Sequence, residues 1–205
     1  MEVTDLILGQ TFEVSGNPMV APWAECVRVN SCGAVALGGG KIVQVGDAGR
    51  LKKSYPGARI TDYGDHLICP GFIDAHAHYP QTAIIASWGK QLIDWLNTYT
   101  FPQEMRLADP AYAREIADRY LDLTLSFGTT TVCSYATIHP ASVDAFLEAA
   151  ERRGLRSIAG KTCMDRNAPE DLRDTAQSAY DDSKALLNRW HERGRAQYAI
   201  TPRFS

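Results

Sequence analysis

Two histidines, His76 and His78, are the residues of this chain whose type and spacing most clearly allow metal chemistry. They end the segment Pro-Gly-Phe-Ile-Asp-Ala-His-Ala-His at residues 70–78, whose apolar residues predict a buried β-strand. Because side chains alternate along a strand, Asp74, His76 and His78 are expected on one face. Imidazole nitrogens bind zinc at about 2.0–2.1 Å, so this pair can supply two ligands to one ion, with Asp74 orienting a ring. The alternative is a pair of core or loop-end histidines with ordinary hydrogen bonds.

The length and composition indicate a globular chain of one or two domains. Of the 205 residues, 45% are hydrophobic, which is enough to build a substantial core. The formal net charge is −3, and the Lys and Arg residues are scattered along the sequence. A nucleic-acid polymer is therefore not an expected partner.

The N-terminal residues and the cysteines indicate the cellular compartment. The chain begins without the basic and apolar regions of a signal peptide, and it has no apolar run of about 18 residues. We therefore expect a cytoplasmic protein that does not bind a membrane. The five cysteines are an odd number without a C-x-x-C pair. This pattern argues against disulfides or a cysteine zinc site and predicts buried free thiols.

Residues 1–69 are predicted to form part of a small all-β domain. Short β-prone runs alternate there with turn signals, such as the glycines at 38–40. The runs lie at residues 3–14, 25–37, 41–46 and 58–69.

From residue 70 the pattern changes to alternating strands and helices, which predicts right-handed βαβ crossovers and a parallel sheet. The helices are expected at residues 110–126, 142–153 and 172–193, and the strands begin near residues 71, 129, 155 and 197. A TIM barrel has eight βα units in about 250 residues. The four units over residues 70–205 therefore correspond to half of such a barrel.

The segment at residues 70–78 resembles the first-strand metal motif of the amidohydrolase superfamily, where it opens a (β/α)8 barrel. Further segments narrow the resemblance to the guanine deaminase family, closely over residues 60–205 and more loosely before. They are His-Tyr-Pro-Gln at 78–81, the run at 92–102, Gly-Thr-Thr-Thr at 128–131, Lys-Thr-Cys-Met-Asp at 161–165 and Thr-Pro-Arg-Phe-Ser at 201–205. The resemblance implies an α/β fold: the first half of a metal-dependent hydrolase TIM barrel, preceded by part of a composite β-sandwich domain.

The same resemblance implies a site that binds one zinc ion per subunit and a purine. His76 and His78 would be the zinc ligands, and the substrate pocket would be formed by His78, Tyr79, Pro80, Gln81, Arg203 and Phe204. A guanidinium fork suits the acceptor atoms of guanine, an aromatic face suits a flat base, and an amide can read a purine edge. Taken alone, Gln81 would be a loop residue, Arg203 a solvated charge and Phe204 a core residue. The last two follow a predicted barrel strand, where barrel enzymes place their chemistry.

The activity implied is zinc-dependent hydrolytic deamination of guanine to xanthine and ammonia, by an intact protein expected to be a homodimer. No catalytic residue is expected within the chain, because the proton shuttle and the remaining zinc ligands of the family would follow residue 205. The 205 residues alone are therefore expected to be inactive. Two alternatives are another aminohydrolase of the same subgroup, acting on cytosine, a triazine or an adenosine derivative, and a non-catalytic interaction protein on the amidohydrolase scaffold.

Overall fold

The computed structural model describes residues 2–89 and 91–204. Ser205, which ends the motif at 201–205, lies outside the described residues. The chain divides into two compact units, Met1–Pro70 and Gly71–Ser205, and each is described by itself.

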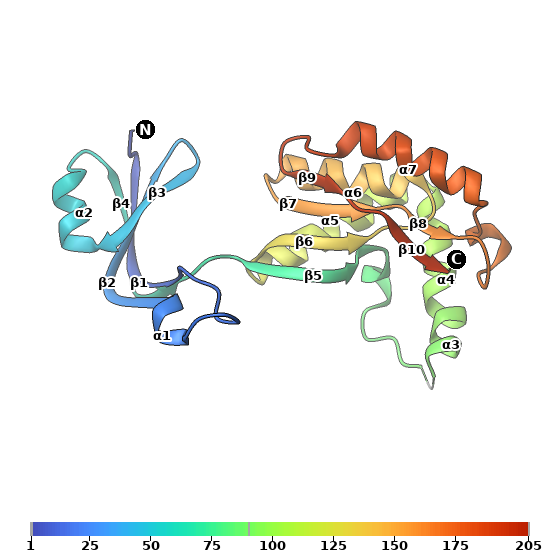
Figure 1. Cartoon of the computed structure of the whole chain (residues 1–205), viewed down its shortest axis with the longest axis horizontal. Coiled ribbons are helices and arrows are strands. Elements are labelled where there is room, and N and C mark those ends of the chain that lie inside the picture. Colours follow the sequence, from blue (N-terminus) through green and yellow to red (C-terminus); the bar gives the residue numbers. More distant parts are fainter. Residues whose placement is uncertain (1, 90, 205) are drawn as a thin grey trace. The chain divides into compact units, whose positions relative to one another are not determined.

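The first unit is built on a four-stranded sheet in the order β3-β2-β1-β4 (Figure 1). Its strands are β1 (Asp5–Val14), β2 (Val27–Gly38), β3 (Lys41–Asp47) and β4 (Arg59–Ile68), each within two residues of a predicted run. β1 pairs antiparallel with β2 and parallel with β4. Gly39 and Gly40 have φ values of 55° and 72°, which the tight turn between β2 and β3 requires and which glycine adopts without strain.

This unit also contains two short helices that the sequence did not predict. They are α1 (Trp23–Cys26) and α2 (Ala48–Ser54). Asp47 caps α2, because its side chain accepts a hydrogen bond from the backbone N–H of Arg50. Leu51 of α2 is fully buried and joins Leu6 and Leu8 in the core of the unit, so α2 packs against the sheet.

The second unit contains a parallel sheet in the order β5-β6-β7-β9, which confirms the predicted α/β class. The strands are β5 (Phe72–His78), β6 (Thr129–Tyr135), β7 (Arg156–Gly160) and β9 (Ala196–Tyr198). The helices α5 (Pro110–Ser126), α6 (Pro140–Arg152) and α7 (Ala176–Trp190) alternate with them along the chain and cover one face of the sheet (Figure 1). Gly128 and Gly154, just past α5 and α6, have φ values of 83° and 67°, as expected of helix ends. None of the described helices is long and apolar enough to cross a membrane.

Beyond the carboxyl ends of β7 and β9 the chain forms a second parallel pair, β8 (Thr162–Met164) with β10 (Thr201–Phe204). Gly160 permits the close approach that precedes this pair, because a Cβ atom there would lie 1.9 Å from the carbonyl oxygen of Ala199. The Thr201 hydroxyl donates to the Lys161 carbonyl at 2.6 Å. β10, which carries Arg203 and Phe204, is thus fixed at the carboxyl end of the sheet.

Between β5 and α5 the chain is mostly helical. It forms η1 (Tyr79–Ile84) and then four contiguous helical pieces, α3 (Leu92–Trp95), η2 (Leu96–Thr100), α4 (Phe101–Met105) and η3 (Arg106–Ala108). The η2 piece is a π-helical turn that ends at Thr100, two residues before Pro102. Proline lacks the N–H of a helical hydrogen bond and its ring crowds the carbonyl four residues back, so a widened turn at this point accommodates it.

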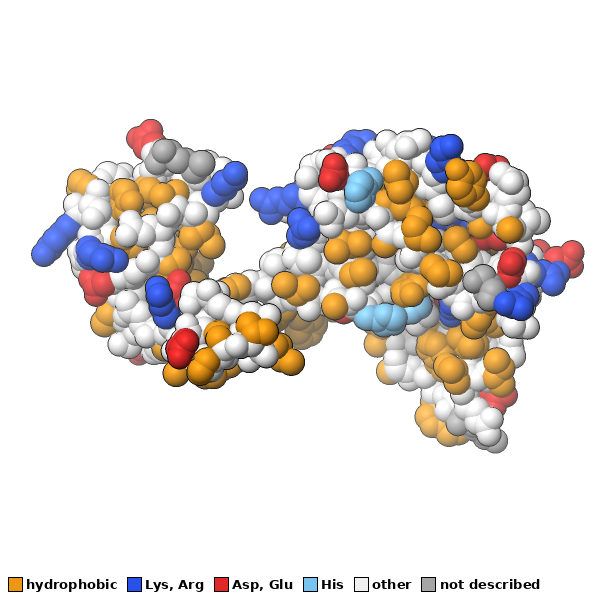
Figure 2. Space-filling model, viewed as in Figure 1, with side chains coloured by type: hydrophobic (Ala, Val, Ile, Leu, Met, Phe, Trp, Pro, Cys, Tyr) orange, Lys and Arg blue, Asp and Glu red, His pale blue; other side chains and the backbone are white. Residues whose placement is uncertain are grey.

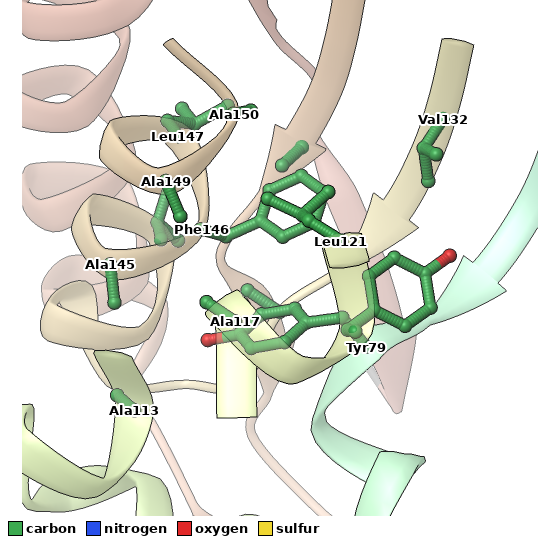
Figure 3. Packing of buried hydrophobic residues seen from close by; sticks show 14 of the residues in the cluster. Tyr79, Ala113, Ala117, Leu121, Val132, Ala145, Phe146, Leu147, Ala149 and Ala150 are labelled. Carbon is green, nitrogen blue, oxygen red and sulfur yellow. The ribbon is translucent and has the colours of Figure 1, made fainter. Parts of the chain in front are cut away.

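Tyr79 lies in the main core of the second unit, among side chains of α5 and α6 (Figure 3). Its side chain is fully buried and its ring stacks on Phe146 with centroids 5.0 Å apart. The hydroxyl donates to the carbonyl oxygen of Ser142 at 2.6 Å. Tyr79 therefore stabilises the packing of helices on the sheet directly after the metal motif.

All five cysteines are free, but the prediction that they are buried is wrong for most of them. Only Cys26 is buried, Cys133 and Cys163 are half-buried, and Cys32 and Cys69 are exposed. Free cysteine behaves as a small hydrophobic residue and is usually buried, so the exposure of Cys32 and Cys69 departs from the tendency on which the prediction was based.

We expect Tyr79→Phe to lower the free energy of unfolding by about 0.5–1.5 kcal/mol, because a buried hydrogen bond is lost while the ring packing stays. Tyr180→Phe is the matched control, because Tyr180 is 59% exposed and should change the stability by less. Urea unfolding of both variants measures the difference. Equal stability of the two variants would contradict the core role of the Tyr79 hydroxyl.

Candidate active site

His76 and His78 lie together at the carboxyl end of β5. Their ring centroids are 5.3 Å apart, with the ring planes at 68°. The His78 ring stacks on Tyr135 of β6, with centroids 4.7 Å apart and planes within 6°. His78 and Tyr135 are register partners in the parallel sheet. The strand pairing therefore fixes the orientation of the His78 ring.

The electrostatic environment keeps His78 neutral. Burial lowers the pKa of His78 to about 4, and the nearby guanidinium of Arg203 acts in the same direction. An imidazole must be neutral to offer a lone pair to a metal ion. His78 is therefore in its metal-binding form at neutral pH.

Asp74 does not share the face of the two histidines, which corrects the expectation from simple alternation. The register of β5 against β6 shifts between Asp74 and Ala77, so that Asp74 pairs with Val132 while His78 pairs with Tyr135. Val132 is part of the helix-facing core. The Asp74 carboxylate accepts a hydrogen bond from the backbone N–H of His76 at 3.1 Å, so it supports the backbone of the motif.

One pocket of about 400 Å³ brings together residues from three distant segments. Five of the residues expected from the sequence line it: His76, His78, Gln81, Arg203 and Phe204. The other lining residues are Leu92, Trp95, Leu96, Tyr135 and Pro202. Histidine side chains are visible at the surface beside hydrophobic ones in Figure 2. The pocket thus combines imidazoles, an amide, a guanidinium and aromatic rings.

Arg203 is held at this pocket by a buried carboxylate. Its Nη1 lies 3.0 Å and 2.9 Å from the two carboxylate oxygens of Glu104 on α4. The Arg203 side chain is 13% exposed, and that of Glu104 is fully buried. The guanidinium carbon also lies 5.8 Å from the ring centroid of Phe101 and 5.3 Å from that of Phe204. The position of the positive charge is therefore fixed from several sides.

Burial raises the pKa of Glu104, while the charge and hydrogen bonds of Arg203 and the amide of Gln81 act to lower it. Glu104 is thus the charged partner of the guanidinium that β10 brings to the pocket. The sequence did not single it out, because the segment at 92–108 shows no clear apolar period and contains Pro102.

Tyr79 and Pro80, which the family resemblance placed in the pocket, are buried elsewhere. The Tyr79 ring lies in the core, and the Pro80 carbonyl accepts a hydrogen bond from the Gln103 amide at 3.1 Å. Conversely, Trp95 and Tyr135 line the pocket although their residue types suggest only packing. No signal in the sequence distinguishes them from core aromatics.

The described residues contain no group of three His, Cys, Asp or Glu side chains that could hold a metal ion. A catalytic zinc site typically has three protein ligands. His76 and His78 fit two of these positions by residue type and by their mutual placement. They can therefore contribute part of a metal site.

The chain is similar to guanine deaminases. It is 46% identical to the guanine deaminase of Escherichia coli K12 over 183 aligned residues. The aligned region covers 89% of this chain and 42% of that relative. The solved E. coli structure superimposes with a TM-score of 0.92 at 43% identity, over 98% of this chain and 47% of that chain. This chain spans less than half the length of the relatives it matches.

Two further solved structures share the fold. Guanine deaminase from C. acetobutylicum with bound guanine is 26% identical with a TM-score of 0.85, over 98% of this chain and 46% of that one. Atrazine chlorohydrolase from Arthrobacter aurescens complexed with zinc is 22% identical with a TM-score of 0.79, over 97% of this chain and 46% of that one. A model of an imidazolonepropionase-like bacterial composite domain matches residues 33–58. The model of the amidohydrolase family matches residues 67–204, and the chain belongs to this family.

Proposed function

We propose that this chain supplies the first metal ligands and the purine pocket of a guanine deaminase, which hydrolyses guanine to xanthine and ammonia. The observation that carries the proposal is the single pocket in which two imidazoles lie beside an anchored guanidinium and an aromatic ring. The similarity to guanine deaminases, one of them with bound guanine, supports the choice of substrate.

Arg203 suits the oxygen-bearing edge of guanine. Both contacts of Arg203 with Glu104 use Nη1. Nε and Nη2 have no hydrogen-bond partner within the described part of the chain and can therefore face a ligand. An arginine fork pairs with the O6 and N7 acceptors of guanine, whereas adenine presents an amino donor in place of O6. Phe204, which packs edge-on against Phe101, offers a flat base an apolar neighbour.

His76 and His78 would hold the metal ion of the site. A zinc ion bound there would supply a hydroxide nucleophile near neutral pH. The role of the two residues is to present imidazole nitrogens to it, for which the low pKa of His78 is suited. The metal site and the guanidinium then act on different parts of one base.

We expect the complete enzyme that contains this chain to prefer guanine over adenine. An amino group opposite the Arg203 fork leaves buried polar groups unpaired, at a cost of about 1–3 kcal/mol. Ammonia release with each purine, expressed as kcat/KM, measures the preference. Similar values for the two bases would overturn the assignment of guanine.

His76→Ala and Arg203→Ala should fail in different ways. We expect His76→Ala to lose bound zinc and nearly all activity, and Arg203→Ala to keep its zinc and mainly raise KM. His66→Ala is the control, because His66 is an exposed residue of the first unit whose ring makes a hydrogen bond only with the backbone carbonyl of Tyr63 among the described residues. Elemental analysis beside kinetics separates the roles. Loss of zinc from Arg203→Ala, or full zinc in His76→Ala, would show that the roles are misassigned.

A further inference from the structure

Glu104 is a buried acidic residue that the proposed chemistry does not yet use. Its side chain has no exposed surface, and it lies on α4 directly after the π-helical turn. It touches the pocket only through other residues, because Glu104 itself is not among the lining residues. A buried carboxylate is costly unless it is paired, so its partners should explain its place.

We propose that Glu104 is a positioning residue, which holds the Arg203 guanidinium by Nη1 and so keeps Nε and Nη2 free for the purine. The proposal rests on the proposed function and names a residue that sets its specificity. Both oxygens of Glu104 contact the same nitrogen of Arg203, at 3.0 Å and 2.9 Å. Because both carboxylate oxygens contact Nη1, they occupy one terminal nitrogen of the guanidinium and leave Nε and Nη2 for a ligand.

Gln81 lines the same pocket as Arg203, and its amide offers a ligand both a donor and an acceptor. Arg203 offers donors only, and its direction is set by the contact with Glu104. The proposed selectivity for the oxygen-bearing edge of the purine therefore rests on the pair of Arg203 and Glu104.

The local fold gives Glu104 a fixed position. Phe101 and Leu96 of the same helical segment are buried with Met164 and Leu172 in a small core, and Phe204 packs against it. This core joins α4 to the β8–β10 pair. The carboxylate and the guanidinium are thus set by packing on both sides, and the pair does not depend on flexible side chains meeting in solvent.

A purely stabilising ion pair is the competing explanation. Buried ion pairs are weak evidence for stability, because apolar side chains of similar volume often stabilise a fold as well or better. The two explanations differ in what they predict for substrate selectivity. A positioning role requires that Glu104 act on the purine through Arg203, whereas a stabilising role does not.

The test uses Glu104→Gln in the complete enzyme, with Glu148→Gln as the control because Glu148 is an exposed residue of α6. We expect Glu104→Gln to keep its zinc and to raise KM for guanine by about tenfold or more, with a smaller fall in kcat. 2,6-Diaminopurine keeps the 2-amino group but replaces O6 by an amino group. The preference for guanine over 2,6-diaminopurine should fall in Glu104→Gln and stay unchanged in Glu148→Gln.

A double-mutant cycle with Arg203→Ala completes the test. If Glu104 acts through Arg203, the double variant Glu104→Gln/Arg203→Ala should bind guanine no worse than Arg203→Ala, within about twofold. The positioning role would be overturned if the increase of KM in the double variant were the product of the increases in the two single variants. It would also be overturned if Glu104→Gln lowered kcat but left KM and the selectivity unchanged.

Calorimetric binding of guanine separates this proposal from the proposed function. An unsubstituted enzyme that binds guanine without turnover would overturn the function only, and the loss of binding in Glu104→Gln would still decide the role of Glu104. An enzyme that neither binds nor deaminates guanine would overturn both.

Discussion

The ion pair between Arg203 and Glu104 joins two segments that lie 99 residues apart in the sequence. Taking both charges out of water is costly, and the pair recovers that cost only with close geometry and further hydrogen bonds. The structure provides the close geometry, because both oxygens of Glu104 contact Nη1 of Arg203, at 3.0 Å and 2.9 Å, and the rings of Phe101 and Phe204 lie beside the guanidinium. A pocket with a defined donor edge depends on this arrangement. Without Glu104, the largely buried guanidinium of Arg203 would lose its charged partner.

The parallel sheet determines which residues can meet at this pocket. The carboxyl ends of β5 and β6 carry His78 and Tyr135, and the extension of the sheet into β8 and β10 carries Arg203 and Phe204. Parallel strands place their carboxyl ends at one edge, where barrel enzymes build their sites from strand ends and loops. The helical segment before α5 then brings Glu104 and Trp95 to the same edge. The site is therefore a consequence of topology, and the chemistry of individual residues follows from their place at a strand end.

The sequence predicted those parts of the structure that repeat with a clear period. The predicted helix at 110–126 and the strand predicted to begin near residue 129 agree with α5 and β6, because both have regular apolar spacing and clear ends. Gln81 and Arg203 were expected in the pocket through the family resemblance, and the structure places them there. Their roles in binding a purine remain proposals.

The parts of the structure that the sequence did not predict depend on features without a periodic signal. The register shift in β5 turns Asp74 away from the histidines, and strand alternation alone could not reveal it. The helical segment at 92–108 was not predicted, since Pro102 and several polar residues weaken its helical pattern. Glu104 was missed for the same reason, because only the three-dimensional fold shows that it is buried beside Arg203. Tyr79 could not be assigned to the core, since a tyrosine after a metal motif suits either place.

The central claim is that one pocket holds a metal through His76 and His78 and a purine through an arginine fixed by Glu104. A crystal structure of the complete enzyme with zinc and bound xanthine, with anomalous scattering measured at the zinc edge, tests it most directly. Xanthine keeps the O6 and N7 atoms of guanine. The account predicts a zinc peak at the imidazole nitrogens of His76 and His78, xanthine O6 and N7 facing Nε and Nη2 of Arg203, and Nη1 on Glu104. A zinc peak away from both histidines, or a purine bound with Arg203 turned off Glu104, would contradict it.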